Sequence, residues 1–248
     1  MPRYFLQLSY KGTNYHGWQI QPNAHTVQAE LQLALSTVLR KEIEIMGSGR
    51  TDTGVHAKKQ VAHFDLAEEV NCEDLIYKLN SFLPEDIAIE SCRPVKAEAH
   101  TRFDANERAY HYYLHQSKSP FLTKRSYYYS QNLDVELMNL AATKLIGSQD
   151  FESFSKVKTE VNNFICNISE ANWFLENDQL VFHVRANRFL RGMVRALVGT
   201  LLLVGENKLS VEEFVEVIKA KNRKAAGRAV PPHGLYLTEV SYPEHIYL

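Results

Sequence analysis

The sequence predicts an α+β fold of two halves that share one mostly antiparallel sheet, with the helices on one side of it. In the first half, segments with the two-residue period of strands and segments with the period of helices follow in the order β-α-β-β-α-β. This order is the signature of a split βαβ sandwich. The second half alternates strands and helices in a similar way, without a clear sequence repeat. We expect the halves to be residues 1–105 and 106–248.

The elements of the first half follow from periodicity and from capping residues. Thr26 can cap one helix and Asn71 a second one, which Pro84 prevents from continuing. A glycine-rich loop is expected at residues 47–54. The expected strands are residues 3–10, 43–46, 60–66 and 87–93.

The second half is interpreted by the same rules. A helix is expected over residues 134–146 and a longer one over 188–204, and Ser210 opens a third with a capping box. A hairpin turn is expected at residues 176–178. The expected strands are residues 108–115, 164–174, 180–187 and 235–241.

The composition is that of an ordinary globular protein and argues against several classes. Of the 248 residues, 45% are hydrophobic and 23% are charged. No apolar run approaches the roughly 20 residues that span a bilayer, and the first residues enter a strand pattern without a signal region. Cys72, Cys92 and Cys166 lie far apart in the sequence, which disfavours a disulfide framework or a cysteine-rich zinc site. We therefore expect a cytoplasmic protein that has no membrane partner.

Basic residues gather in two runs although the net charge is −1. Residues 185–195 hold four arginines, and residues 219–228 hold five lysines and arginines, with no acid in either run. A basic surface on a neutral protein is typical of a polyanion binder. A solvated helix face has the same pattern, so both interpretations stay open for each run.

The loop GRTDTGVHA at residues 49–57 is the most informative stretch. Asp52 stands between small residues, and Arg50 precedes it by two positions. This pattern predicts an ionised carboxylate near a cation, which is the form that a nucleophile or a base needs. A tight turn in which Asp52 bonds its own backbone has the same composition, and the local pattern does not decide between the two.

Two other interpretations of this region are weaker. The tripeptide at residues 52–54 matches the aspartic proteases, which need two carboxylates that share one proton. Only one such tripeptide is present, so a dimer would be required, and Arg50 would disfavour the shared proton. His56 and His63 stand seven residues apart with no third ligand at suitable spacing. We expect them to be structural, with no metal bound.

Two patterns in the second half could contribute to a site. Arg188, Arg191 and Arg195 fall at positions i, i+3 and i+7 of the expected long helix and would form one stripe. Arg195 lies among apolar residues, and a partly buried arginine usually has a carboxylate partner. Tyr110 and Tyr112 share one face of an expected strand, where tyrosines either pack a core or stack on unpaired bases.

Together these motifs resemble the TruA-type tRNA pseudouridine synthases. The loop GRTDTGVHA is similar to the central motif of that family. Further landmarks occur in the family's order across nearly the whole chain. They are YxGxxYxGWQxQ at residues 10–21, HxRF at 100–103, RxYxY at 108–112, DFxSF at 150–154, NxFLRxMVR at 187–195 and GLYL at 234–237.

The resemblance implies two ferredoxin-like halves, a continuous sheet with a central RNA-binding cleft, and a homodimer. It implies that uridines 38, 39 and 40 in the tRNA anticodon stem-loop become pseudouridine without a cofactor or a metal. It implies that Asp52 is the catalytic nucleophile, that Arg195 pairs with it, that Arg50 assists base extrusion and that Tyr110 stacks on the target base. The candidates for contacts to the RNA backbone are Lys58, Arg188, Arg191, Lys221 and Arg223.

The reaction explains why these residue types are needed. The bond from N1 to C1′ must break, the base must turn while it is held, and C5 must bond C1′. A carboxylate can attack C1′ or C6 or remove the C2′ proton, and the sequence does not choose among these. Extruding a base costs a few kcal/mol, which stacking and phosphate contacts can offset.

One stretch departs from the family pattern. Between Phe154 and Phe164 the family often has an arginine, where this chain has Lys156, Lys158 and the pair at residues 162–163. The exact uridines that are modified therefore stay open, and a non-catalytic RNA-binding module remains an alternative to the enzyme.

Overall fold

In a computed structural model, residues 1–157 and 163–248 are described. They form two compact units, of which unit 1 comprises Met1–Glu107 and Tyr236–Leu248, and unit 2 comprises Arg108–Leu235. The boundary was expected after residue 105 and lies after Glu107, two residues later. The last residues of the chain, Tyr236–Leu248, were expected in the second half. The chain end instead belongs to unit 1, because β10 (Leu235–Ser241) pairs in parallel with β3 (His56–Asp65).

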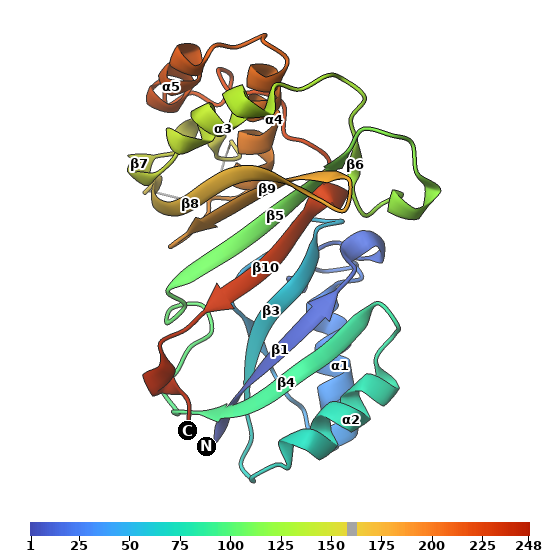
Figure 1. Ribbon diagram of the computed structural model, residues 1–248. Helices are drawn as coiled ribbons and strands as arrows, with labels where there is room; N and C mark the ends of the chain where they lie inside the picture. The colour runs from blue at the N-terminus through green and yellow to red at the C-terminus, as the bar shows by residue number, and fades with distance from the viewer. Residues whose placement is uncertain (158–162) are drawn as a thin grey trace. The chain divides into compact units, whose positions relative to one another are not determined.

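Unit 1 is a sheet with two helices on one face (Figure 1). Its strands follow the order β4-β1-β3-β10, and β2 pairs with β3. The pairs β1·β3, β1·β4 and β2·β3 are antiparallel. The remaining elements are β1 (Arg3–Tyr10), α1 (Val27–Leu39), β2 (Met46–Gly47), α2 (Cys72–Phe82) and β4 (Ile87–Val95). The predicted order β-α-β-β-α-β is confirmed.

Both helices of unit 1 begin where capping predicts. Thr26 Oγ1 accepts a hydrogen bond from the Ala29 N–H at 3.4 Å, and Asn71 Oδ1 accepts one from the Asp74 N–H at 3.0 Å. These side chains satisfy N–H groups that have no partner inside the helix.

The strand expected at residues 43–46 is wrong in extent, because pairing begins only at Met46. Side chains of α1 hold the preceding residues. The Ile43 N–H donates to Ser36 Oγ at 3.0 Å, and the Ile45 carbonyl accepts from Gln28 Nε2 at 2.9 Å. Their backbone groups are thus satisfied without a neighbouring strand.

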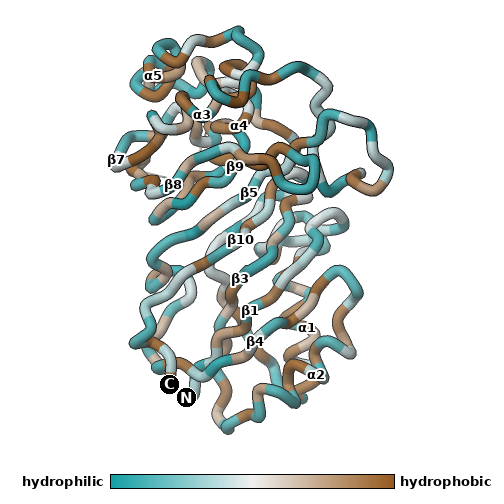
Figure 2. The backbone as a smooth tube through the Cα atoms, in the orientation of Figure 1, coloured by the Kyte–Doolittle hydropathy of each residue, from teal (hydrophilic) through white to brown (hydrophobic). Residues whose placement is uncertain are grey.

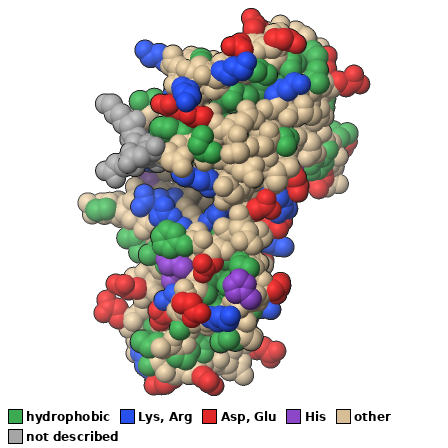
Figure 3. All heavy atoms as spheres, turned by 90° about the vertical axis from the view of Figure 1, so that its left-hand side faces the viewer, with side chains coloured by type: hydrophobic (Ala, Val, Ile, Leu, Met, Phe, Trp, Pro, Cys, Tyr) green, Lys and Arg blue, Asp and Glu red, His purple; other side chains and the backbone are tan. Residues whose placement is uncertain are grey.

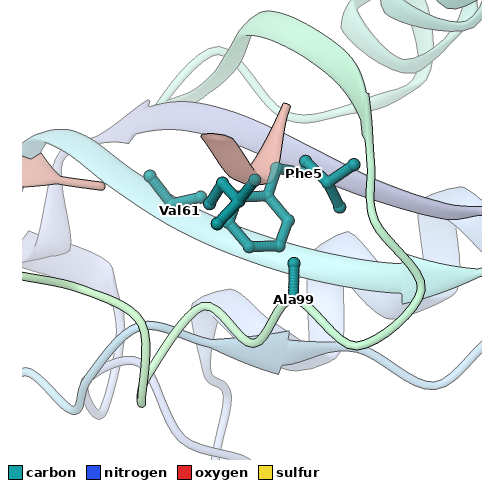
Figure 4. Packing of buried hydrophobic residues seen from close by; sticks show 5 residues of the cluster. Phe5, Val61 and Ala99 are labelled. Atoms are coloured by element: carbon teal, nitrogen blue, oxygen red, sulfur yellow. The ribbon is translucent and has the colours of Figure 1, made fainter. Parts of the chain in front are cut away.

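The face of β1 opposite the helices carries a second small core. Phe5 packs there with Val61, Val95, Ala99 and Ile246 (Figure 4). Because Ile246 comes from the last residues of the chain, this cluster fastens the chain end to the first strand. The buried contact explains why the end of the chain belongs to unit 1.

Unit 2 is a sheet in the order β5-β9-β8-β7, with β6 paired to β5, and its helices lie together on one face (Figure 1). The pairs along this order are antiparallel. Its elements are β5 (Glu107–His115), β6 (Tyr127–Tyr128), α3 (Val135–Thr143), β7 (Gly147–Asp150), β8 (Ile165–Glu176), β9 (Gln179–Ala186), α4 (Met193–Gly205) and α5 (Val211–Lys219). The α+β class and the mostly antiparallel pairing are confirmed.

A turn and a helix cap in unit 2 lie where the sequence predicted them. Asn177 and Asp178 have φ angles of 48° and 62°, which is the geometry of the predicted hairpin turn. Ser210 and Glu213 form the predicted capping box. The helix expected over residues 134–146 ends earlier, at Thr143, and the short strand β7 that follows was not predicted.

The distribution of hydropathy follows this architecture (Figure 2). Hydrophobic and hydrophilic residues alternate along the strands and helices, while the connecting loops are mostly hydrophilic. Two of the cysteines meet in this packing, since the Sγ atoms of Cys72 and Cys92 lie 2.9 Å apart as free thiols. Burial raises the pKa of the Cys92 thiol, and a hydrogen bond with Cys72 adds to this effect.

Candidate active site

The loop that carries Asp52 runs from β2 to β3, and a buried glutamine holds its first part. The Ser48 N–H donates to the Val61 carbonyl at 2.8 Å, and Ser48 Oγ donates to Gln60 Oε1 at 2.5 Å. Gln60 Nε2 in turn donates to the Gly49 carbonyl at 3.1 Å. Gln60 is fully buried, so these bonds are shielded from water.

The segment before α1 holds the rest of the loop. The Trp18 N–H donates to the Thr51 carbonyl at 3.4 Å, and the Gly54 N–H donates to the Tyr15 carbonyl at 3.4 Å. The Tyr10 hydroxyl lies 2.9 Å from Thr51 Oγ1. Two parts of the chain that the sequence only marked as separate landmarks are therefore bonded to each other.

Glycine is required for this close approach. A Cβ atom on Gly12 would lie 1.9 Å from the Val55 carbonyl oxygen, and one on Gly17 would lie 2.3 Å from the Thr51 carbonyl oxygen. Gly17 also has a φ of +88°, a backbone angle that residues with a Cβ atom rarely adopt. Only glycine at these two positions lets the segment close on the loop.

Within this frame, Asp52 is half-buried and Arg50 is exposed. The Asp52 carbonyl accepts a hydrogen bond from the Val55 N–H at 3.1 Å and closes a tight turn. The turn and the reactive carboxylate were alternatives at the level of sequence, but they are compatible. The backbone carbonyl of Asp52 makes the turn, and the side-chain carboxylate takes no part in that hydrogen bond.

His56, the first residue of β3, has a structural role. Its Nδ1 accepts a hydrogen bond from the Gly12 N–H at 3.0 Å, so the neutral ring carries its proton on Nε2. The ring stacks on Tyr236 with centroids 4.6 Å apart. Exposed Lys58 places Nζ 5.9 Å from the same tyrosine ring. This stack links β10 to the start of β3.

In unit 2, Tyr110 and Tyr112 share a face of β5 but differ in burial. Tyr112 is fully buried and donates its hydroxyl to the Pro231 carbonyl at 2.8 Å. Its pKa is raised, mainly by burial. Tyr110 is half-buried, and the ring of Phe189 lies edge-on to it, with centroids 5.1 Å apart and planes at 87°. Tyr112 therefore packs the core, whereas Tyr110 keeps accessible surface.

Arg195 lies in the first turn of α4 and is half-buried. Its Nε donates to the Val230 carbonyl at 2.7 Å, and the Val230 N–H donates to the Arg195 carbonyl at 3.1 Å. The guanidinium also lies close enough to His233 to help lower the pKa of that imidazole, after the larger effects of burial and of His115. The paired bonds with Val230 fix the direction of the arginine side chain.

The predicted arginine stripe is wrong. The helix begins at Met193 and not at residue 188, because Gly192 has a φ of 73° and cannot continue a right-handed helix. Half-buried Arg188 and exposed Arg191 therefore lie on the segment before α4, and only Arg195 is on the helix. The carbonyl of Arg191 accepts a hydrogen bond from the Lys156 N–H at 2.9 Å instead of a helical partner.

The second basic run is neutralised in part by groups from elsewhere. Lys221 Nζ lies 2.8 Å from Asp150 Oδ2 of β7. Burial alone would raise the pKa of the Asp150 carboxyl, but hydrogen bonds from Lys221 and from the Glu152 N–H lower it overall. Arg223 Nη1 donates to the carbonyls of Ala226 and Gly227 at 3.2 and 3.0 Å. The run contains no acid of its own, yet the fold supplies one.

The predicted site residues fall into two groups. Unit 1 contains Arg50, Asp52 and Lys58, and unit 2 contains Tyr110, Arg188, Arg191, Arg195, Lys221 and Arg223. Of the stretch that departs from the family pattern, Lys158 and Asn162 lie outside the described residues. Across residues 1–157 and 163–248, no cluster of three metal-ligating side chains occurs, and no helix is long and apolar enough to cross a membrane.

Sequence reasoning missed two residues that hold the candidate site. Gln60 was detectable, because it is a polar residue at an apolar position of an alternating strand, in line with Ala62 and Phe64. Phe189, which packs against Tyr110, falls in the range 188–204 that was expected to be helical, but the helix begins only at Met193.

Known proteins are similar to this chain over most of its length. A family model described as tRNA pseudouridine synthase matches residues 8–104 and 141–243. Proteins named tRNA pseudouridine synthase A are 50% identical in Bacteroides thetaiotaomicron, over 100% of this chain and 93% of the relative, and 48% identical in Parabacteroides distasonis, over 100% and 98%. The relative of that name in Exiguobacterium sibiricum is 36% identical over 98% of both chains.

A solved Cbf5-Nop10-Gar1 complex is a distant structural match. Its TM-score is 0.32 at 12% identity, and the match covers 81% of this chain and 54% of that chain. A similarity at this level supports no inference about the fold.

Proposed function

Because the chain belongs to the tRNA pseudouridine synthase family, we propose that this isomerase converts uridines 38, 39 and 40 of the tRNA anticodon stem-loop to pseudouridine. Family membership removes the aspartic protease and the binding-only module as alternatives. We further propose that the protein acts in the cytoplasm as a homodimer. The observation that carries the catalytic proposal is the loop GRTDTGVHA, in which half-buried Asp52 is set in a turn held by hydrogen bonds from two directions.

Asp52 acts as the nucleophile toward the nucleotide whose base has left the stack, and the bond that it forms breaks again before the product is released. The bond between N1 and C1′ breaks, the uracil turns while it is held, and C5 forms the new bond to C1′. The proton on C5 is lost and N1 gains one, so the product is an isomer of the substrate and no redox step is needed. A rigid loop suits this role because the carboxylate must keep its direction while the base moves.

Tyr110 and Arg195 support the same reaction from unit 2. Tyr110 stacks on the target base, and the edge-on contact with Phe189 holds the tyrosine ring in one orientation. Arg195 pairs with Asp52, and the bond from its Nε to the Val230 carbonyl sets the direction of the guanidinium. Exposed Arg50 assists in extruding the base. These roles follow the family motifs.

The candidates for phosphate contacts divide by their surroundings. Lys58, Arg188 and Arg191 are proposed to contact the RNA backbone directly. Lys221 is paired with Asp150, and Arg223 donates to carbonyls of its own loop, so their contribution to phosphate binding is expected to be smaller.

The test uses an unmodified tRNA transcript with uridines at all three positions and maps pseudouridine after incubation. We expect the wild-type protein to modify positions 38 to 40 and Asp52→Asn to lose turnover while its tRNA affinity stays within a few-fold, since the amide keeps the shape without the nucleophile. Glu85→Gln, an exposed acid of the same unit, is the control and should match the wild type.

Each part of the proposal can fail separately. Near-normal turnover by Asp52→Asn would remove Asp52 from the chemistry. Pseudouridine at other tRNA positions would contradict the proposed positions and leave the family activity intact.

A further inference from the structure

The connection between β4 and β5 contains a turn that presents an aromatic ring to solvent. Phe103 is 74% exposed, although Thr101, two residues earlier, is fully buried. Exposed single hydrophobic side chains are common on proteins and usually need no explanation. This one differs because hydrogen bonds hold the backbone on both sides of the ring.

Three hydrogen bonds close the turn on itself. The His100 N–H donates to Asp104 Oδ2 at 2.7 Å, and the Asp104 N–H donates to the His100 carbonyl at 3.0 Å. The Arg102 N–H donates to His100 Nδ1 at 3.1 Å. The backbone on both sides of Phe103 therefore has little freedom.

Thr101 fastens this turn to the sheet of unit 1. Its N–H donates to His63 Nδ1 at 3.3 Å, its hydroxyl donates to the Met46 carbonyl at 2.9 Å, and its carbonyl accepts from the Tyr242 hydroxyl at 2.7 Å. Burial is the main cause that lowers the pKa of His63 to about 4, so the ring is neutral near pH 7, and its Nδ1 also lies 2.8 Å from Thr101 Oγ1. Met46 is the first residue of β2, which leads directly into the Asp52 loop.

The ring and its neighbours have the chemistry of a base-stacking platform. The Phe103 ring packs against the His100 ring with centroids 4.3 Å apart, and Arg102 Cζ lies 5.7 Å from the Phe103 centroid. Unpaired bases are recognised by stacking on aromatic rings, with arginine or lysine at the adjacent phosphate.

The surroundings are polar. A hollow of about 370 Å³ borders Phe103, and among its lining residues are Lys96, Glu98, Asp104 and Asn106. On the face shown in Figure 3, hydrophobic, histidine, basic and acidic side chains are interspersed in the part that belongs to unit 1. A protein-docking surface is expected to have an apolar core, whereas base edges need donors and acceptors.

We propose that Phe103 and Arg102 form a binding site for an unpaired nucleobase of the tRNA and its phosphate, separate from the residues assigned to the target uridine. The ring stacks on the base, and the guanidinium contacts the phosphate. The attachment of the turn to β2 makes the site part of the same unit as Asp52. This inference rests on the proposed function, because it names a further contact to the same substrate.

The first test measures binding and kinetics with the unmodified tRNA transcript. Phe103→Ala should raise the Kd and the KM at least about fivefold, the lower end for one base stack, while kcat stays within about twofold. Phe103→Trp should keep the affinity. Phe82→Ala, a half-exposed phenylalanine at the end of α2, is the matched control and should behave as the wild type.

A second readout reports stacking directly. The tryptophan of Phe103→Trp should be quenched when the transcript binds, whereas the tryptophan of Phe82→Trp should not. Arg102→Gln should lower the slope of log affinity against log salt by about 0.7 to 0.9, the value for one phosphate contact.

Three results would overturn the inference. Wild-type affinity in Phe103→Ala, with tRNA modification by the wild-type protein intact, would reject this site and leave the proposed function standing. An unquenched tryptophan in Phe103→Trp under saturating transcript would also reject it. If Phe103→Ala sediments as a smaller oligomer than the wild type, the Phe103 ring contacts a second copy of the chain and not a base. Failure of the wild-type protein to modify any tRNA would instead reject the proposed function.

Discussion

The Asp52 loop in unit 1 and the Arg188–Arg195 segment in unit 2 both carry proposed site residues, but they are held in different ways. Backbone hydrogen bonds and two glycines clamp the Asp52 loop against residues 12–18. The arginine segment changes conformation at Gly192, and Arg195 is fixed by its bonds with Val230. The loop therefore depends on space for its backbone, whereas the direction of the arginine depends on a side-chain bond to the Val230 carbonyl.

The largest expected loss of stability follows from placing a side chain between Gly17 and the Asp52 loop. In Gly17→Ala the new Cβ would lie 2.3 Å from the Thr51 carbonyl oxygen at a φ of +88°. We expect the free energy of unfolding to fall by about 3 kcal/mol or more, with loss of activity, because overlap and backbone strain add. Urea unfolding of purified protein measures this.

Gly49→Ala in the same loop is the control, since its added Cβ meets no atom within 4 Å. Its free energy of unfolding should stay within about 1 kcal/mol of the wild type. Equal effects of the two substitutions would show that closure of residues 12–18 on the loop does not stabilise it.

The next effect concerns Arg195 and should separate activity from stability. Arg195→Met keeps much of the side-chain volume but loses the charge and the bond to the Val230 carbonyl. The single-turnover rate should fall by about a hundredfold, as for the loss of one electrostatic contact in an active site, while the protein stays folded. Arg195→Lys should restore little, because a point charge lacks the planar fork of arginine.

Rapid-quench measurements and thermal melts of both variants decide this, with Lys144→Met at an exposed position of unit 2 as the control. Folded variants with wild-type rates would leave Arg195 as an anchor for Val230 alone.

The smallest effect distinguishes two exposed lysines. Lys58 Nζ lies 5.9 Å from the Tyr236 ring, whereas Lys221 is paired with Asp150. Lys58→Met should lower the slope of log tRNA affinity against log salt by about 0.7 to 0.9, as for one phosphate contact, and Lys221→Met should lower it by less than half of that. Affinity titrations from low to high salt test this, and the reverse order would contradict the division of the basic residues.

Much of the fold was predictable because its signals act over a few residues. Thr26, Asn71 and Ser210 cap the helices that they were expected to cap, and the turn at Asn177 and Asp178 has the left-handed angles of its hairpin. A cap or a two-residue turn is satisfied by neighbouring atoms, so the sequence around it carries nearly all the information.

The sequence predicted which residues belong to the candidate site better than it predicted which of them touch each other. The landmark segments named Asp52 and Tyr110, but the close contact of Gly17 with Thr51 joins parts of the chain that are 34 residues apart in number. The sequence pattern shows that these glycines stand in landmarks and does not show what they face.

By itself, the sequence determined the α+β class, the starts of the helices that Thr26, Asn71 and Ser210 cap, and the family to which the chain belongs. The tertiary structure alone decided that α4 begins after Gly192, that the chain end packs with Phe5, and that Lys221 has Asp150 as a partner. The physical reason is distance along the chain. Capping and turn preferences are local free energies, whereas a buried contact or an ion pair between remote segments exists only after the backbone has brought them together.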